Sequence, residues 1–147
     1  MRQQVKVKKL NDKAILPTYG SPYSAGADLY ACMDENVTIH PGETVMIKTG
    51  LAMEIPEGFA GLIYARSGLA TKKGLAPANK VGVIDADYRG EIGVILVNLS
   101  AEPFTIADGE RICQMVITTH AHVEGEAVET LDETERGAGG FGHTGKA

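Results

Sequence analysis

Short apolar runs separated by turn residues restrict the fold of this 147-residue chain more than any other feature. The runs are rich in valine and isoleucine, and glycine, proline or aspartate separates them. This pattern is typical of an antiparallel barrel or jelly roll, whereas a doubly wound parallel sheet would alternate strands with helices. We therefore predict an all-β fold, an antiparallel barrel or jelly roll with one short helix. The expected strands lie at 5–8, 25–31, 37–39, 45–55 with a bend at Gly50, 59–65, 81–84, 92–97, 104–106 and 111–119.

The most informative stretch has two apolar runs, Val81–Ile84 and Ile92–Val97, around the polar centre Asp85–Gly90. Turn residues between β-rich runs predict a β-hairpin, with two carboxylates and a tyrosine on its bend. Glycine inside a strand, here Gly82 and Gly93, often marks close approach by a ligand or another backbone. The stretch therefore predicts a pocket built from backbone, with an acidic side chain at its rim.

One helix is expected, over Arg66–Gly74. Ser67 is a candidate N-cap, lysines occupy the last turn, and Gly74 is a C-terminal stop. The N–H groups of Ser67 and Gly68, with Arg66 adjacent, are suited to an anion. A purely structural cap is the alternative.

The composition is that of an ordinary globular domain, with 44% hydrophobic and 22% charged residues. No apolar run approaches transmembrane length, and the first residues lack the apolar core of a signal peptide, so we expect no membrane association. The net charge of −5 argues against nucleic acid polymers as partners. An acidic protein that handles a polyphosphate would need local cationic groups and a divalent metal.

The two cysteines, Cys32 and Cys113, are far apart and have no metal-binding spacing. We expect reduced, buried side chains in a cytoplasmic protein, an intermolecular disulfide being the alternative.

Glycine dominates the end of the chain, so we predict a domain over residues 1–135 followed by a flexible tail over 136–147. Exposed glycine N–H groups, with Arg136, His143 and Thr144 as further donors, resemble a phosphate cradle. A disordered solubility tail is the alternative. Phe141 has no core to join in a glycine run, but an aromatic ring there is able to stack on a base.

Several other polar residues leave two interpretations open. Asp28 is either the anchor of a hydrated metal or a surface carboxylate. Gln114, in an apolar run, either satisfies a buried backbone group or points into a site. His120 and His122 have the spacing of a metal pair on a strand, or they belong to an exposed edge.

Five short motifs follow one another along the chain. They are AGADLYA (25–31), RSGLA (66–70), GVIDADYRG (82–90), ERICQM (110–115) and RGAGGFGHTG (136–145). In this order they resemble the motifs of the trimeric deoxyuridine triphosphatases, the dUTPases, across nearly the whole chain. The third and fifth motifs are the most specific, and no position that this family uses for chemistry departs from its pattern.

The resemblance implies an all-β subunit, a distorted jelly-roll β-barrel with one short helix and a flexible glycine-rich C-terminal tail, in a homotrimer with each active site shared between subunits. It implies hydrolysis of dUTP to dUMP and pyrophosphate with Mg²⁺, which limits uracil in DNA and supplies dUMP for thymidylate synthesis. Asp85 would activate the water that attacks the α-phosphorus, and Asp28 would hold the metal through bound waters. The substrate-binding residues implied are Arg66, Ser67, Gly68, Asn79, Gly82, Val83, Ile84, Tyr88, Gln114, Arg136, Phe141, Gly142, His143 and Thr144.

These roles agree with the chemistry of the residues. Uracil presents an acceptor–donor–acceptor edge, which backbone N–H and C=O groups around Asn79–Val83 are able to match. Cytosine would leave buried polar groups unpaired, at about 1–3 kcal/mol each. A narrow pocket has no room for the 5-methyl group of thymine, and Tyr88 beside the sugar would exclude a 2′-hydroxyl.

Two other functions compete with this one. A dCTP deaminase-like enzyme has a similar fold, but that family carries a glutamate where deamination occurs and lacks a Gly-Gly-Phe-Gly tail. A non-catalytic nucleotide-binding regulator would be expected to have lost Asp85 or the tail, and both are present.

Overall fold

The computed structural model describes residues 2–145 and is built almost entirely of β-strands. The elements are β1 (Lys6–Lys9), β2 (Thr18–Tyr19), β3 (Ala27–Tyr30), β4 (Val37–Ile39), β5 (Thr44–Lys48), β6 (Leu51–Glu54), β7 (Phe59–Tyr64), α1 (Ser67–Lys73), β8 (Leu75–Pro77), β9 (Gly82–Ile84), β10 (Gly93–Asn98), β11 (Phe104–Ile106) and β12 (Arg111–Thr119).

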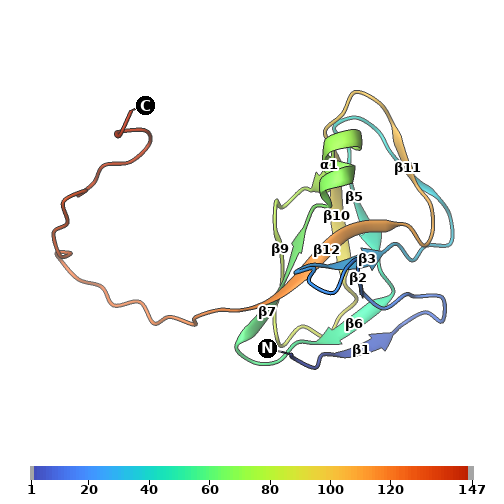
Figure 1. Ribbon diagram of the computed structural model, residues 1–147, viewed down its shortest axis with the longest axis horizontal. Coiled ribbons are helices and arrows are strands. Elements are labelled where there is room, and N and C mark those ends of the chain that lie inside the picture. The colour runs from blue at the N-terminus through green and yellow to red at the C-terminus, as the bar shows by residue number, and fades with distance from the viewer. Residues whose placement is uncertain (1, 146–147) are drawn as a thin grey trace.

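The strands form antiparallel sheets in which neighbours in space are rarely neighbours in sequence. The largest sheet has the order β2-β3-β12-β7-β9, and a second has the order β5-β10-β8. Two further pairs, β1-β6 and β11-β4, complete the body seen in Figure 1. This connectivity confirms the predicted all-β jelly roll with one short helix.

The core lies between the sheets and draws on most of them. Leu29 of β3 and Ile63 of β7 pack in one cluster with Ile47 of β5 and Leu96 of β10. Along β10 the side chains alternate, so that the even-numbered residues from 94 to 98 are buried. This alternation is what a strand with one face against a core requires.

The predicted hairpin over Val81–Ile84 and Ile92–Val97 is wrong, although both apolar runs are strands. β9 pairs with β7, whereas β10 pairs with β5 and β8, so the two runs lie in different sheets. The polar segment between them is therefore a crossover between sheets. The hairpin prediction failed because strand pairing depends on cross-strand partners and on burial, and nearness in sequence decides neither.

Gly50 bends the predicted strand 45–55 more sharply than expected, so that it becomes β5 and β6 in separate sheets. Its φ angle is +68°, in the left-handed region that glycine tolerates. A Cβ atom there would also lie 2.9 Å from both Ala14 Cβ and Cys32 Sγ.

The strands β2 and β8 were not predicted, because runs of two or three residues give almost no periodic signal.

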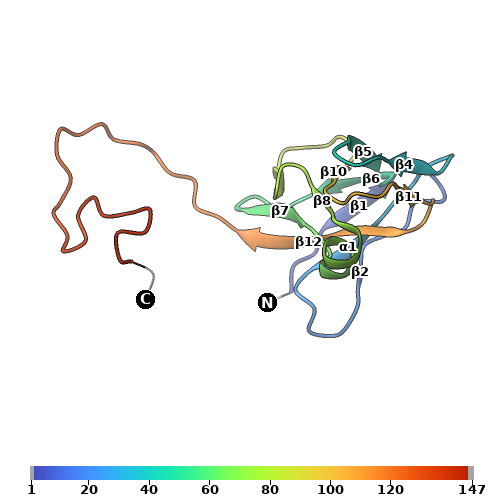
Figure 2. The same ribbon diagram turned by 90° about the horizontal axis from the view of Figure 1, so that it is seen from above.

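Residues 120–145 contain no helix or strand and leave the body of the molecule in both views (Figures 1 and 2). Apart from the His120 N–H, which donates to the Gly58 carbonyl, the backbone hydrogen bonds found for this segment are internal to it. The division into a domain and a flexible tail stays a prediction.

Candidate active site

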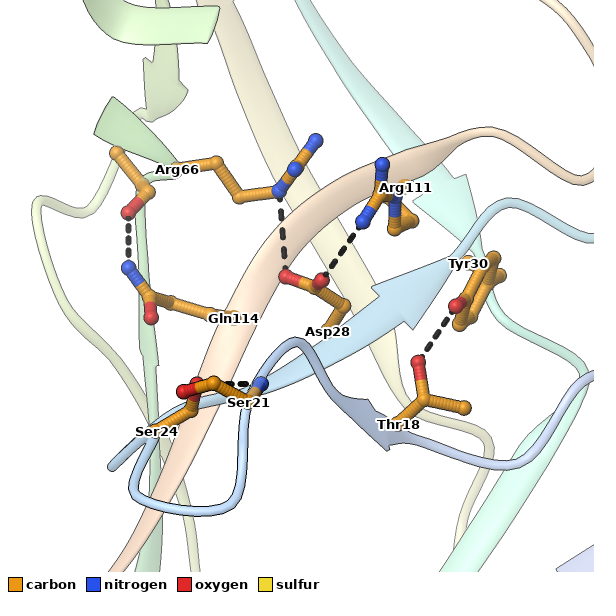
Figure 3. Close-up of polar contacts among 9 residues, drawn as sticks. Thr18, Ser21, Ser24, Asp28, Tyr30, Arg66, Arg111 and Gln114 are labelled. Carbon is orange, nitrogen blue, oxygen red and sulfur yellow. Dashed lines mark hydrogen bonds and ion pairs between the residues drawn. The ribbon is translucent and has the colours of Figure 1, made fainter. Parts of the chain in front are cut away.

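Three motifs that are distant in sequence meet where β3, β12 and the end of β7 lie side by side (Figure 3). In the register of the sheet, Gln114 on β12 is opposite Asp28 on β3 and opposite Tyr64 on β7. Directly opposed residues in an antiparallel pair have Cα atoms about 5 Å apart. The sheet therefore places the first, second and fourth motifs at one point.

Asp28 lies between two arginines at this point. Its Oδ1 atom is 3.2 Å from Arg66 Nε, and its Oδ2 atom accepts a hydrogen bond from Arg111 Nη1 at 3.4 Å. Only 14% of the Asp28 side chain is exposed, so the interpretation as an isolated surface carboxylate is excluded. One carboxylate and two guanidinium groups leave this cluster with a net positive charge, which suits an anionic ligand.

Gln114 satisfies a backbone group, which is the first of the two alternatives. Its Nε2 atom donates to the Ala65 carbonyl at 2.9 Å, directly before Arg66. Gly26 makes room for this side chain, since a Cβ atom at Gly26 would lie 2.2 Å from Gln114 Oε1. The amide therefore ties β12 to the start of α1.

Arg111 is a site residue that the sequence interpretation missed. Residues three apart on a regular strand face opposite sides, so Arg111 and Gln114 should not share a face. The register between β12 and β3 shifts between Arg111 and Cys113, and Ile112 and Cys113 are both buried. Such an irregularity re-aims a side chain. Two consecutive apolar residues between polar ones are the signal that would have revealed it.

The helix is confirmed, but its predicted N-cap is wrong by one residue. Arg66, with extended backbone angles, occupies the N-cap position without a side-chain cap bond, and Ser67 is the first helical residue. The Ser67 hydroxyl is therefore not used as a cap. Gly74 ends the helix in the left-handed conformation at φ +65°, as predicted. Within residues 2–145, no helix has the length and apolar character needed to cross a bilayer.

Asp85 lies on the exposed crossover that follows β9. The Tyr88 N–H donates to the Asp85 carbonyl at 3.2 Å, and the Tyr88 hydroxyl donates to the Glu91 carbonyl at 2.8 Å. Arg89 Nη1 donates to the Ala86 carbonyl at 2.6 Å. These bonds hold the turn in shape while the Asp85 side chain faces solvent.

The β9 strand lies at the edge of the five-stranded sheet, beyond β7. An edge strand leaves a row of backbone N–H and C=O groups unpaired. Gly82 is buried against Ile63: a Cβ atom added at Gly82 would lie 3.2 Å from Ile63 Cβ. The next residue, Val83, is exposed. Backbone polar groups are thus available beside Asn79 and Gly82–Ile84, although not within a hairpin.

The structure does not bring all the predicted site residues together in one chain. Within residues 2–145, no hydrogen bond or ion pair joins Asp85 to the cluster around Asp28. The tail residues of the fifth motif lie away from the body in Figures 1 and 2. Phe141 is fully exposed at φ +54°, and Arg136 Nε donates only within the tail, to the Gly139 carbonyl at 2.7 Å.

The histidine pair receives no support as a metal site. His120 and His122 are exposed and follow the end of β12. Among the residues that the structure describes, no three His, Cys, Asp or Glu side chains are grouped to hold a metal. Mg²⁺ needs no such group, because it is commonly bound by one or two carboxylates together with substrate phosphates and waters. Asp28 fits that mode.

Both cysteine thiols are free and buried, as predicted. Burial is the main cause that raises the pKa of Cys113 to about 12; the nearby Asp28 carboxylate contributes to this rise, and Arg66 opposes it. The thiol beneath the cluster is therefore protonated at neutral pH and is not a nucleophile.

Comparison with known proteins identifies the family of the chain. The dUTPase family model matches residues 12–145. A deoxyuridine 5′-triphosphate nucleotidohydrolase of Syntrophotalea carbinolica is 50% identical over 141 residues, which are 96% of each chain. A dUTPase variant of Staphylococcus bacteriophage 80alpha, solved with dUpNHpp, has a TM-score of 0.90 and 30% identity over 99% of this chain and 100% of that one.

A second solved structure is a variant of the dUTPase from phage phi11 of S. aureus. It has a TM-score of 0.78 and 28% identity over 87% of this chain and 98% of that one, and it is described as showing the coordination of a structural Mg(II) ion. The family match covers most of the chain, and the identity of 50% extends over nearly all of it. This chain is a member of the dUTPase family.

Proposed function

We propose that this protein hydrolyses dUTP to dUMP and pyrophosphate, which limits uracil in DNA and supplies dUMP for thymidylate synthesis. The structural observation that carries the proposal is the largely buried Asp28 carboxylate between Arg66 and Arg111 at the start of α1. Such a cluster is able to receive a polyphosphate and its cation together, even though the chain is acidic overall. The two free, buried thiols support a cytoplasmic location.

The phosphates of dUTP bind around the N-terminal end of α1. Arg66 contacts Asp28 through Nε, so its two terminal amino groups are left for phosphate oxygens. Ser67 and Gly68 contribute backbone N–H groups of the first helical turn, which have no hydrogen-bond acceptor within the helix. The Gln114 amide, bonded to the Ala65 carbonyl, lies beside this turn. Asp28 would hold Mg²⁺ through bound waters, and the ion would supply positive charge to offset that of the phosphates.

The attacking water is held by Asp85. The carboxylate is exposed at a turn whose backbone is braced by Tyr88 and Arg89, so its position is defined while it stays open to solvent. Asp85 orients the water toward the α-phosphorus and accepts its proton. General-base assistance of this kind contributes about 10²–10⁴-fold.

Uracil is recognised by backbone. Its acceptor–donor–acceptor edge pairs with N–H, C=O and N–H groups of the free edge of β9 near Asn79 and Gly82–Ile84. Cytosine would place like groups opposite one another there, and each buried mismatch costs about 1–3 kcal/mol. Tyr88 lies against the sugar and leaves no room for a 2′-hydroxyl.

The site is completed by the tail of another subunit in a homotrimer. The tail leaves its own body, and Phe141 is fully exposed, which supports a function outside the parent subunit. Arg136, His143 and Thr144 close over the γ-phosphate, while Phe141 and Gly142 cover the uracil. The proposed division is therefore a jelly-roll domain over residues 1–135 and a segment over residues 136–147 that closes the site, with residues 1, 146 and 147 outside the described part of the chain.

The test is release of pyrophosphate from dUTP, dTTP, dCTP and UTP, each with Mg²⁺ and with EDTA. We expect turnover of dUTP with Mg²⁺ at least about 100-fold above that of the other three nucleotides, because mismatched polar groups are rejected strongly. Ammonia release from dCTP would instead identify a deaminase. Binding of dUTP without pyrophosphate release would identify a non-catalytic regulator.

Selection against ribose is expected to depend on Gly90. A Cβ atom at this position would lie 2.4 Å from Tyr88 Oη and 2.6 Å from Cζ. Gly90→Ala therefore displaces the tyrosine ring and breaks its hydrogen bond to the Glu91 carbonyl. Because the ring is partly exposed, we expect little loss of thermal stability.

The expected result is that the ratio of kcat/KM for dUTP to that for UTP falls about tenfold. Gly125→Ala is the matched control, since a Cβ atom at Gly125 has no neighbour within 4 Å. An unchanged ratio in Gly90→Ala would show that the tyrosine ring does not select the sugar.

A further inference from the structure

We propose that Arg111 is a positioning residue, which holds the Asp28 carboxylate in the orientation needed for the Mg²⁺ that accompanies the nucleotide. The inference rests on the proposed function and goes beyond it, because neither the five-motif resemblance nor the substrate-binding set assigns a role to Arg111.

The contacts of Asp28 divide its two oxygens between two arginines. Arg66 approaches Oδ1, and Arg111 donates to Oδ2 (Figure 3). Arg66 also faces the site where phosphates bind, so its guanidinium responds to the nucleotide. Arg111 comes from the opposite side, from the beginning of β12. Arg111 is therefore the donor that keeps its hydrogen bond to Asp28 when Arg66 binds phosphate oxygens.

The backbone geometry indicates that this contact is built into the fold. The register of β12 against β3 shifts between Arg111 and Cys113, and this irregularity turns Arg111 to the face that Asp28 occupies. Ile112, within the shift, and Cys113, at its end, are both buried and anchor it in the core. The guanidinium is thus held by the strand, even though 48% of its side chain is exposed.

The charge of the cluster determines when the cation binds. With two guanidinium groups beside one carboxylate, Asp28 alone does not attract a hydrated Mg²⁺. The phosphates supply the missing negative charge, so the cation enters with the nucleotide. The role of Asp28 is to orient one carboxylate oxygen so that it accepts a hydrogen bond from a metal-bound water. Without Arg111 the carboxylate keeps only its contact with Arg66 and turns toward it.

The experiment measures binding of the non-hydrolysed analogue dUpNHpp by calorimetry, once with Mg²⁺ and once with EDTA. The ratio of the two affinities is the Mg²⁺ enhancement. In Arg111→Ala we expect this enhancement to fall about tenfold, as for loss of a charge-assisted hydrogen bond, while the affinity in EDTA changes less than about threefold. In Asp28→Asn the enhancement is largely lost, and adding Arg111→Ala to that variant lowers it no further.

Lys8→Ala is the matched control, because it removes one positive charge from an exposed position on β1, in another sheet. It is expected to lower both affinities slightly and equally. If Arg111→Ala unfolds at a lower temperature, Arg111→Gln, which keeps most of the side-chain stem, provides the same measurement.

Two results would overturn the proposal. An equal loss of affinity with Mg²⁺ and with EDTA would show that Arg111 binds phosphate or only supports the fold. An unchanged Mg²⁺ enhancement in Arg111→Ala would show that Asp28 is oriented for the cation without Arg111. Both differ from failure of the proposed function, in which the unaltered protein would neither bind dUpNHpp nor release pyrophosphate from dUTP.

Discussion

Replacing Asp85 by asparagine is expected to lower kcat for dUTP by about 10²–10⁴-fold while the affinity for dUpNHpp stays within about threefold. The carboxylate faces solvent on a braced turn and forms no ion pair among the described residues, so it is open to a water molecule. An amide of the same shape still holds a water but does not accept its proton. Single-turnover hydrolysis and calorimetric binding measure the two effects separately.

Asp87→Asn is the matched control for this variant. Asp87 is an exposed carboxylate two residues further along the same turn, and its removal changes the local charge by the same amount. We expect its turnover to remain close to that of the unaltered protein. Equal losses in the two variants would mean that negative charge at the turn matters and that Asp85 is not the base.

Deleting residues 136–147 is expected to lower kcat/KM by at least about 100-fold and to leave the thermal transition within about 2 °C. The described part of this segment makes no core contact, and its one large apolar side chain, Phe141, is fully exposed. Its loss therefore removes donors to the γ-phosphate and the cover over the base, with little cost to folding. A transition lowered by much more would show that the tail is part of the folded domain.

The deletion also tests whether each site is shared between subunits. Tail-deleted and Asp85→Asn chains, each nearly inactive, are unfolded together at equal ratio and refolded into mixed trimers. A whole site needs Asp85 from one chain and the tail from another, so roughly one quarter of sites should be active. If each tail closed over its own chain's Asp85, no mixture would restore activity. Mass measurement of the refolded trimers checks that they contain chains of both kinds, so that an absence of activity can be attributed to the sites.

Local order along the chain could be predicted from the sequence because it depends on neighbouring residues. The strand around Val5 and Val7, the helix that ends at Gly74, and the bend at Gly50 all follow from periodicity or from a glycine that tolerates a positive φ. The family motifs are also contiguous, so Asp85 and the residues around Arg66 could be singled out without coordinates. The helix cap was misplaced by one residue, since Arg66 and Ser67 are both able to precede a helix, and the short strands β2 and β8 were not predicted.

Pairing between distant segments was decided by the tertiary structure. The two runs around Asp85 looked like one hairpin, yet β9 joins β7 and β10 joins β5, because the burial of each strand against the core outweighs the short loop between them. The link from Arg111 to Asp28 spans 83 residues and depends on the register in which β12 pairs with β3. Side chains that meet across strands are selected by the packing of the whole sheet, and for that reason the sequence alone identified Asp28 but not the arginine that holds it.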